Sequence, residues 1–294
     1  MKAMNSESEG RRRTIRNLAI FTFLVIALGW LGRRLDDALG TPPGQGIGIT
    51  IWIIAPLGLS FLLRAFAGDG WKDLGIRPAI RGNVRWYAVS ILIYPIGFAL
   101  ILVAGYTFRA VAFPDLSLNQ VERFVQALAM GLAWQFFKNL FEEFAFRGYL
   151  APKMNSLRCN ALVAHAVVGL IWGVWHLPYL RVITPYTTES LLTLAPRLLA
   201  GTIAASVVYG EIRILNGSVW PAVLMHTIGG AFVGALMLQD FIAMTRGMEF
   251  LVAPVLEGGG VIVFFTLAGV GLFLGRSRRD RASERRRPQD PHVS

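Results

Sequence analysis

The stretch "GLAWQFFKNLFEEFAFRGYL", residues 131–150, places two adjacent carboxylates and an arginine in an apolar segment. A charged side chain at bilayer depth costs at least about 2.5 kcal/mol, so ionisable groups kept there indicate a functional site. Glu143 and Arg147 are four residues apart and can form an ion pair on one helix face. Glu142 points about 100° away and is free for another partner.

The composition of the whole chain supports a membrane setting for this stretch. Of the 294 residues, 54% are hydrophobic and 16% are charged, whereas a soluble domain is nearer about 25% charged. The chain has one cysteine, Cys159, which excludes disulfides within the chain and cysteine-rich zinc sites.

Eight apolar segments predict an all-α polytopic membrane protein with about eight transmembrane helices. The segments lie near residues 17–32, 47–67, 86–108, 121–145, 159–179, 190–209, 218–239 and 258–275. We expect a basic cytoplasmic tail over 1–16, a membrane domain over 17–275, and a basic, disordered cytoplasmic tail over 276–294. A signal peptide is the alternative for the first segment, although no small-residue cleavage site follows it.

The net charge of +11 is distributed in a way that favours a membrane protein over a nucleic-acid-binding protein. Five of the 29 basic residues lie in residues 1–16 and seven in residues 276–294. The positive-inside rule then predicts a multi-pass protein of the cell membrane with both termini in the cytoplasm. Anionic lipids are expected to contact the two basic tails, and nucleic acid is not expected as a partner.

Two histidines in later apolar segments can join the carboxylates. At about 1.5 Å of rise per helical residue, Glu142, His176 and His226 can meet in the cytoplasmic half of the bilayer. A carboxylate and a histidine can activate water for attack on a carbonyl, directly or through a metal. A second histidine can stabilise the oxyanion or complete a ligand set. His165 is expected to be a hydrogen-bonded packing residue, and Arg197 to pair locally or to extend outward.

Three motifs at these positions resemble those of a known family. Glu142-Glu143-Phe-Ala-Phe-Arg147 matches the pattern EExxxR, and Trp172-Gly-Val-Trp-His176 matches FxxxH with tryptophan in place of phenylalanine. His226 begins a third pattern, HxxxN or HxxxD, whose last position here is Gly230. Over about residues 120–240 the chain therefore resembles the CPBP intramembrane proteases, which include CAAX prenyl endopeptidases and bacteriocin-immunity proteins.

The resemblance implies roles for the clustered residues. Glu142 and His176 would activate the attacking water, His226 would stabilise the oxyanion, and Glu143 and Arg147 would support the site. The resemblance does not decide whether the site needs a metal. It is compatible with zinc held by Glu142, His176 and His226 and also with a site that uses no metal.

Three further residues bear on this site. Trp172 and Asn139 are both expected to support the site. Asn139 lies one helical turn before Glu142 and is a candidate to bind the oxyanion. Gly230 either leaves an oxyanion donor missing or forms a small-residue packing face with Gly234.

The resulting hypothesis is an intramembrane endopeptidase that opens toward the cytoplasm. It would cleave a membrane-bound peptide or protein near its C-terminus or juxtamembrane region, as CAAX processing does. One alternative is a catalytically weak member that acts as a membrane scaffold or immunity factor. Another is a transporter with a proton relay, which should show two similar halves with broken helices.

Overall fold

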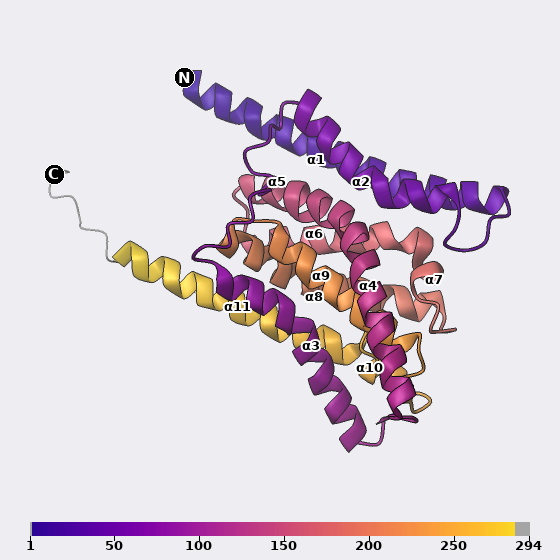
Figure 1. Ribbon diagram of the computed structural model, residues 1–294. Helices are drawn as coiled ribbons and strands as arrows, with labels where there is room; N and C mark the ends of the chain where they lie inside the picture. The colour runs from indigo at the N-terminus through magenta and orange to yellow at the C-terminus, as the bar shows by residue number, and fades with distance from the viewer. Residues whose placement is uncertain (1, 286–294) are drawn as a thin grey trace.

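The computed structural model describes residues 2–285 and consists almost entirely of helices (Figure 1). Two short strands pair antiparallel. In chain order the elements are α1 (Lys2–Ala38), α2 (Ile47–Phe66), α3 (Val84–Thr107), β1 (Val111–Ala112), α4 (Leu118–Ala145), η1 (Phe146–Leu150), α5 (Ala151–Ser156), α6 (Ala161–His176), η2 (Leu177–Tyr179), α7 (Leu180–Ile183), α8 (Leu191–Asn216), α9 (Trp220–Met237), β2 (Ala243–Met244), α10 (Glu249–Val252) and α11 (Gly259–Arg285). The all-α prediction is confirmed.

All eight expected apolar segments are helices, and seven of the described helices are long and apolar enough to cross a membrane. The exception is α4, which has the length, at 28 residues, but not the composition. Its charged residues are Glu122, Arg123, Lys138, Glu142 and Glu143. The chain is therefore a polytopic membrane protein, and the long helix that lacks a sufficiently apolar stretch is the one that contains the paired carboxylates.

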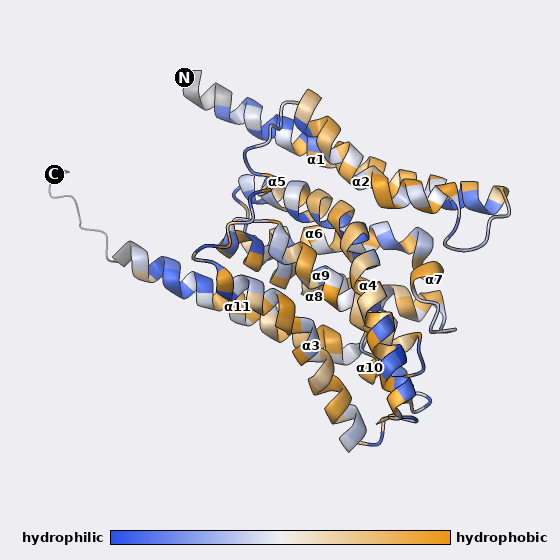
Figure 2. Cartoon of the chain, in the orientation of Figure 1, coloured by the Kyte–Doolittle hydropathy of each residue, from blue (hydrophilic) through white to orange (hydrophobic). Residues whose placement is uncertain are grey.

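Both basic ends of the chain extend a helix of the bundle. α1 begins at Lys2, and α11 continues to Arg285. Residues 276–285 therefore form helix and not the expected disordered tail, while residues 286–294 lie outside the described part. The start of α1 and the end of α11 lie at the same end of the bundle (Figure 1), and Figure 2 shows the coloured turns next to both ends as mostly hydrophilic. This arrangement is the one expected for two tails on one side of a membrane.

The helices α4 and α9 pack closely along one another, and α2 lies against α4 on another side. A Cβ atom added to Gly131 of α4 would lie only 3.3 Å from Cα of Ala231 in α9. Small residues at this contact let the two backbones approach. The close approach brings the carboxylates of α4 within reach of His226 of α9.

A π-helical turn, η1, follows the carboxylates and changes the backbone hydrogen-bonding pattern at the end of α4. Such turns occur often at functional sites. Two guanidinium groups bind its carbonyls: Arg213 Nε donates to the carbonyl of Arg147 at 3.1 Å, and Nη2 of the buried Arg64 donates to that of Gly148 at 2.5 Å. These bonds tie η1 to α8 and α2, and so fix the direction in which Arg147 leaves the backbone.

Candidate active site

Glu142 lies at the centre of a buried polar cluster formed by α4, α6 and α9. Its side chain is inaccessible to solvent, and Oε1 accepts a hydrogen bond from Lys138 Nζ. Oε2 accepts one from the indole Nε1 of Trp172 at 3.2 Å. The same Oε2 lies 3.9 Å from His176 Nε2 and 4.0 Å from His226 Nδ1. The structure thus brings together the three residues that the motifs single out.

His176 is the last residue of α6 and presents a lone pair to Glu142. Its Nδ1 lies 2.8 Å from the carbonyl of Trp172, which can only accept, so Nδ1 is the protonated nitrogen. In the neutral ring Nε2 is then an acceptor. A single water molecule can donate to two acceptors 3.9 Å apart through two hydrogen bonds of about 2.8 Å each. The gap between Glu142 and His176 is therefore suited to hold a water by both of its protons.

Glu143 connects Arg147 with His226. Its Oε1 accepts from Arg147 Nη1 at 3.0 Å and from His226 Nδ1 at 2.8 Å, so the expected ion pair is present. The Arg147 guanidinium also lies against two aromatic rings, 4.2 Å from the centre of Trp172 and 4.3 Å from that of Tyr209. Stacking of this kind stabilises a desolvated cation. Arg147 thereby fixes Glu143, and Glu143 fixes the ring of His226.

The cluster balances its own charge. Lys138 and Arg147 oppose Glu142 and Glu143, so the four ionised groups sum to zero when both histidines are neutral. Glu143 and Arg147 are at most 1% exposed, and buried charges of this kind persist only when they are paired. Lys138 is 17% exposed, so the cluster reaches the surface on the side of α4.

The His226 nitrogen that faces Glu142 is not free to complete a zinc site made of Glu142, His176 and His226. His226 Nδ1 is the nitrogen that faces Glu142, and it is engaged as a donor to Glu143 at 2.8 Å. A metal ligand needs a free lone pair at that atom. Within residues 2–285, no group of three or more histidine, cysteine or acidic side chains is arranged to hold a metal ion.

Asn139 and Gly230 lie one turn from the clustered carboxylates and histidines. Asn139 is fully buried, donates from Nδ2 to Gln135 Oε1 at 3.4 Å and accepts from Lys138 Nζ at 3.4 Å. A Cβ at Gly230 would lie 2.7 Å from Cδ of Gln135, whereas one at Gly234 would meet nothing within 4 Å. Gly230 therefore accommodates a side chain of α4, and Gly234 is not part of that contact.

The sequence motifs do not include three residues of this region: Lys138, Tyr209 and Gln135. Lys138 precedes Glu142 by four residues, and that spacing on one helix face was a usable signal. Tyr209 and Gln135 have no such signal. Their roles depend on the packing of α8 against η1 and of α4 against α9.

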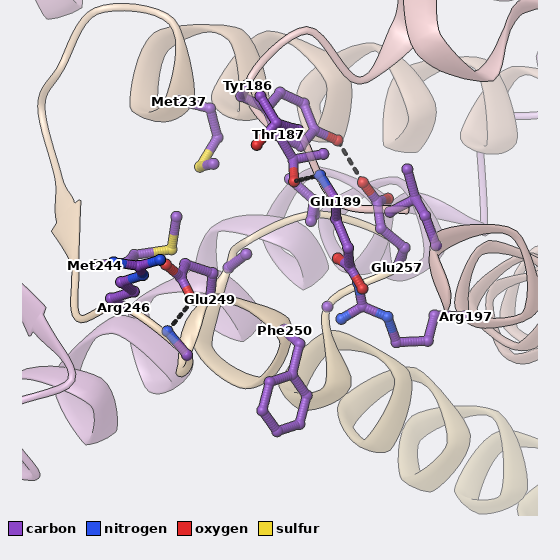
Figure 3. Close-up of a pocket in the computed structure, with 16 residues that line it drawn as sticks. Tyr186, Thr187, Glu189, Arg197, Met237, Met244, Arg246, Glu249, Phe250 and Glu257 are labelled. Atoms are coloured by element: carbon purple, nitrogen blue, oxygen red, sulfur yellow. Dashed lines mark hydrogen bonds and ion pairs between the residues drawn. The ribbon is translucent and has the colours of Figure 1, made fainter. Parts of the chain in front are cut away.

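Two other ionisable residues lie apart from the cluster. His165 is buried and 3.2 Å from Glu211, which also binds Arg276. Arg197 forms an ion pair with Glu189, which agrees with the expected local pairing. This second pair lies in a cavity of about 500 Å³ between the start of α8 and the loops around β2 and α10 (Figure 3). Neither Glu142, His176 nor His226 lines that cavity.

Comparison with known proteins places these observations in a family. Residues 124–232 match the family model described as "Type II CAAX prenyl endopeptidase Rce1-like". No curated protein matches the chain. The matched stretch contains all three motifs and every residue of the cluster around Glu142. This match over residues 124–232 supports a relationship to the CPBP family of CAAX-type intramembrane proteases.

Proposed function

We propose that the protein is an endopeptidase that hydrolyses a peptide bond of a membrane-associated substrate with a water molecule activated by Glu142 and His176. The observation that supports this most directly is the pair of acceptors, Glu142 Oε2 and His176 Nε2, that face one another at 3.9 Å in a buried site. A water that donates both protons to them keeps its lone pairs free for attack.

The proposed reaction proceeds in two steps. In the first, the water oxygen attacks the carbonyl carbon of the peptide, and one water proton passes to Glu142. In the second, the bond between carbon and nitrogen breaks, and Glu142 returns this proton to the leaving nitrogen. The products are a carboxylic acid and an amine, and Glu142 is again ionised. Lys138 and the indole of Trp172 hold the two carboxylate oxygens in place throughout.

His226 is positioned to stabilise negative charge on the carbonyl oxygen. Glu143 accepts the proton of its Nδ1, so Nε2 is the nitrogen left for the substrate. When His226 is an imidazolium, Nε2–H donates to the oxyanion, and the adjacent carboxylate Glu143 compensates the added charge.

The location of the site suits a substrate segment at the membrane boundary. Glu142 and Glu143 lie three residues or fewer from the end of α4, close to η1 and the loop after α2. His226 and Lys138 are 14% and 17% exposed, so the cluster is open on one side. A C-terminal or juxtamembrane peptide, as in CAAX processing, can approach from this boundary.

A comparison of membrane proteins from cells that express the native chain or Glu142→Gln tests the proposal. Labelling of new chain termini should reveal cleaved proteins only with the native chain. Glu122→Gln, the same substitution at an exposed position of α4, serves as the matched control and should behave as native. Identical termini in all three samples would contradict proteolysis and would favour a scaffold or immunity role.

A further inference from the structure

The carboxamide of Gln135 lies over Gly230, one helical turn after His226 on α9. A Cβ at Gly230 would be 2.7 Å from Gln135 Cδ, 2.8 Å from Oε1 and 3.0 Å from Nε2. No Cβ is compatible with these distances unless the amide moves. The missing side chain on α9 is thus what makes room for an amide from α4.

A chain of hydrogen bonds orients this amide. Lys138 Nζ donates to Asn139 Oδ1 at 3.4 Å, and Asn139 Nδ2 donates to Gln135 Oε1 at 3.4 Å. The acceptor end of Gln135 is therefore engaged. Among the described residues, the amide of Gln135 is engaged only through Oε1, and Gln135 is only partly buried. Gln135 thus offers two unengaged N–H groups beside the cluster.

Several N–H groups of the cluster are already engaged, while Nε and Nη2 of the buried Arg147 have no hydrogen-bond partner within the described part of the chain. The indole of Trp172 donates to Glu142, and the Nδ1 atoms of His176 and His226 donate to a carbonyl and to Glu143. Neutral His226 has only a lone pair at Nε2, so it must gain a proton before it can bind an oxyanion. The amide of Gln135 is a donor in every protonation state.

We propose that Gln135 Nε2 donates a hydrogen bond to the carbonyl oxygen of the scissile peptide and stabilises the oxyanion as it forms. This inference rests on the proposed function, because it assigns a residue to the same reaction. Asn139 then acts as a positioning residue, since its amide binds Gln135 and not the substrate.

Kinetics of the purified protein in liposomes test the role of the donor. The probe is a fluorogenic peptide with a prenylated cysteine followed by three residues. Gln135→Ala should lower kcat by about 10²–10³-fold, the usual loss for one oxyanion donor, with a much smaller change in KM. Gln126→Ala, at an exposed glutamine of the same helix, is the control and should keep the native kcat. Native kcat for Gln135→Ala would overturn the proposal.

The contact with Gly230 allows a rescue experiment. Gly230→Asn alone should force the Gln135 amide to move, because its Cβ would lie 2.7 Å from Gln135 Cδ. The double variant Gln135→Ala, Gly230→Asn removes this contact and places an amide in the same space. It should recover at least about tenfold in kcat over Gln135→Ala. A double variant as slow as Gln135→Ala, with native thermal stability, would contradict the assignment.

A binding measurement separates failure of this inference from failure of the proposed function. The probe is the same peptide with a phosphinate, which mimics the oxyanion, in place of the scissile amide. The native chain should bind it at least about tenfold more tightly than Gln135→Ala does. Tight and equal binding by both would overturn the role of Gln135 alone. Absence of both binding and turnover in the native chain would overturn the proteolytic function and this inference with it.

Discussion

Glu143 and His226 join α4 to α9 through a hydrogen bond of 2.8 Å, and the same carboxylate oxygen also binds Arg147 at 3.0 Å. Removal of Arg147 would leave Glu143 buried without its cation. We therefore expect Arg147→Ala to lower the free energy of unfolding by about 3–5 kcal/mol. Chemical unfolding in detergent measures this loss.

The double variant Arg147→Ala, Glu143→Gln is the control for this prediction. It removes both charges together, so it should lose less stability than Arg147→Ala alone. Native stability for Arg147→Ala would show that the pair is not desolvated as described.

Asp73, in the loop after α2, should make stability depend on pH. Partial burial raises the pKa of this carboxyl, but hydrogen bonds and charges from Arg64 and Lys153 outweigh the burial and hold the pKa below its ordinary value of 3.8. The folded state thus binds the proton less tightly than the unfolded state. The stabilising contribution is then present above the ordinary pKa and is lost as the pH falls through the folded-state pKa.

Thermal unfolding of Asp73→Asn and the native chain tests this sign. The variant should melt at a lower temperature at pH 7, and the difference between the two melting temperatures should shrink progressively as the pH falls below about 4. Glu9→Gln, at an exposed position of α1, should match the native chain at every pH. A difference for Asp73→Asn that stays constant down to pH 3 would contradict the linkage.

The native cysteine reports the orientation of the bundle. Cys159 is exposed in the loop between α5 and α6, at the end of the bundle that we expect in the cytoplasm. A membrane-impermeant maleimide should label it only after the cells are permeabilised. In a Cys159→Ser background, Asp115→Cys or Arg246→Cys should react in intact cells. The reverse pattern would move the site to the other leaflet.

Metal chelation tests the zinc alternative. His226 Nδ1 faces Glu142 as a hydrogen-bond donor, and we therefore expect a strong zinc chelator to leave turnover of the purified protein unchanged. A loss of activity that added Zn²⁺ restores would show that His226 rotates and that Glu142 and the histidines bind a metal.

The helical architecture could be predicted from sequence because two local properties decide it. These are the length of each apolar segment and the free-energy cost of placing a charged side chain within it. The pairing of Glu143 with Arg147 followed from their spacing of four residues. Residues 276–285 were expected to be disordered but are helical. A run of basic residues indicates that a segment is exposed to water, but it does not indicate where the preceding helix ends.

The finer geometry of the site depends on contacts between distant segments. The stacking of Tyr209 on Arg147 joins residues 62 positions apart, and no periodicity along one helix indicates it. The same holds for Gln135 and Gly230, which meet because α4 and α9 pack antiparallel at small residues. A glycine at the end of a motif therefore indicated a missing side chain, although the space it leaves is filled from another helix.

Glu142 activates the attacking water in the proposed reaction, and single-turnover cleavage by Glu142→Gln tests this role most directly. Glutamine keeps the size of the side chain and an acceptor for Trp172, but it cannot take the proton from the water. Cleavage of the prenylated peptide should slow by at least about 10²–10⁴-fold, the contribution of a positioned general base, while the melting temperature stays close to that of the native chain. A folded Glu142→Gln protein that cleaves within a few-fold of the native rate would contradict the account.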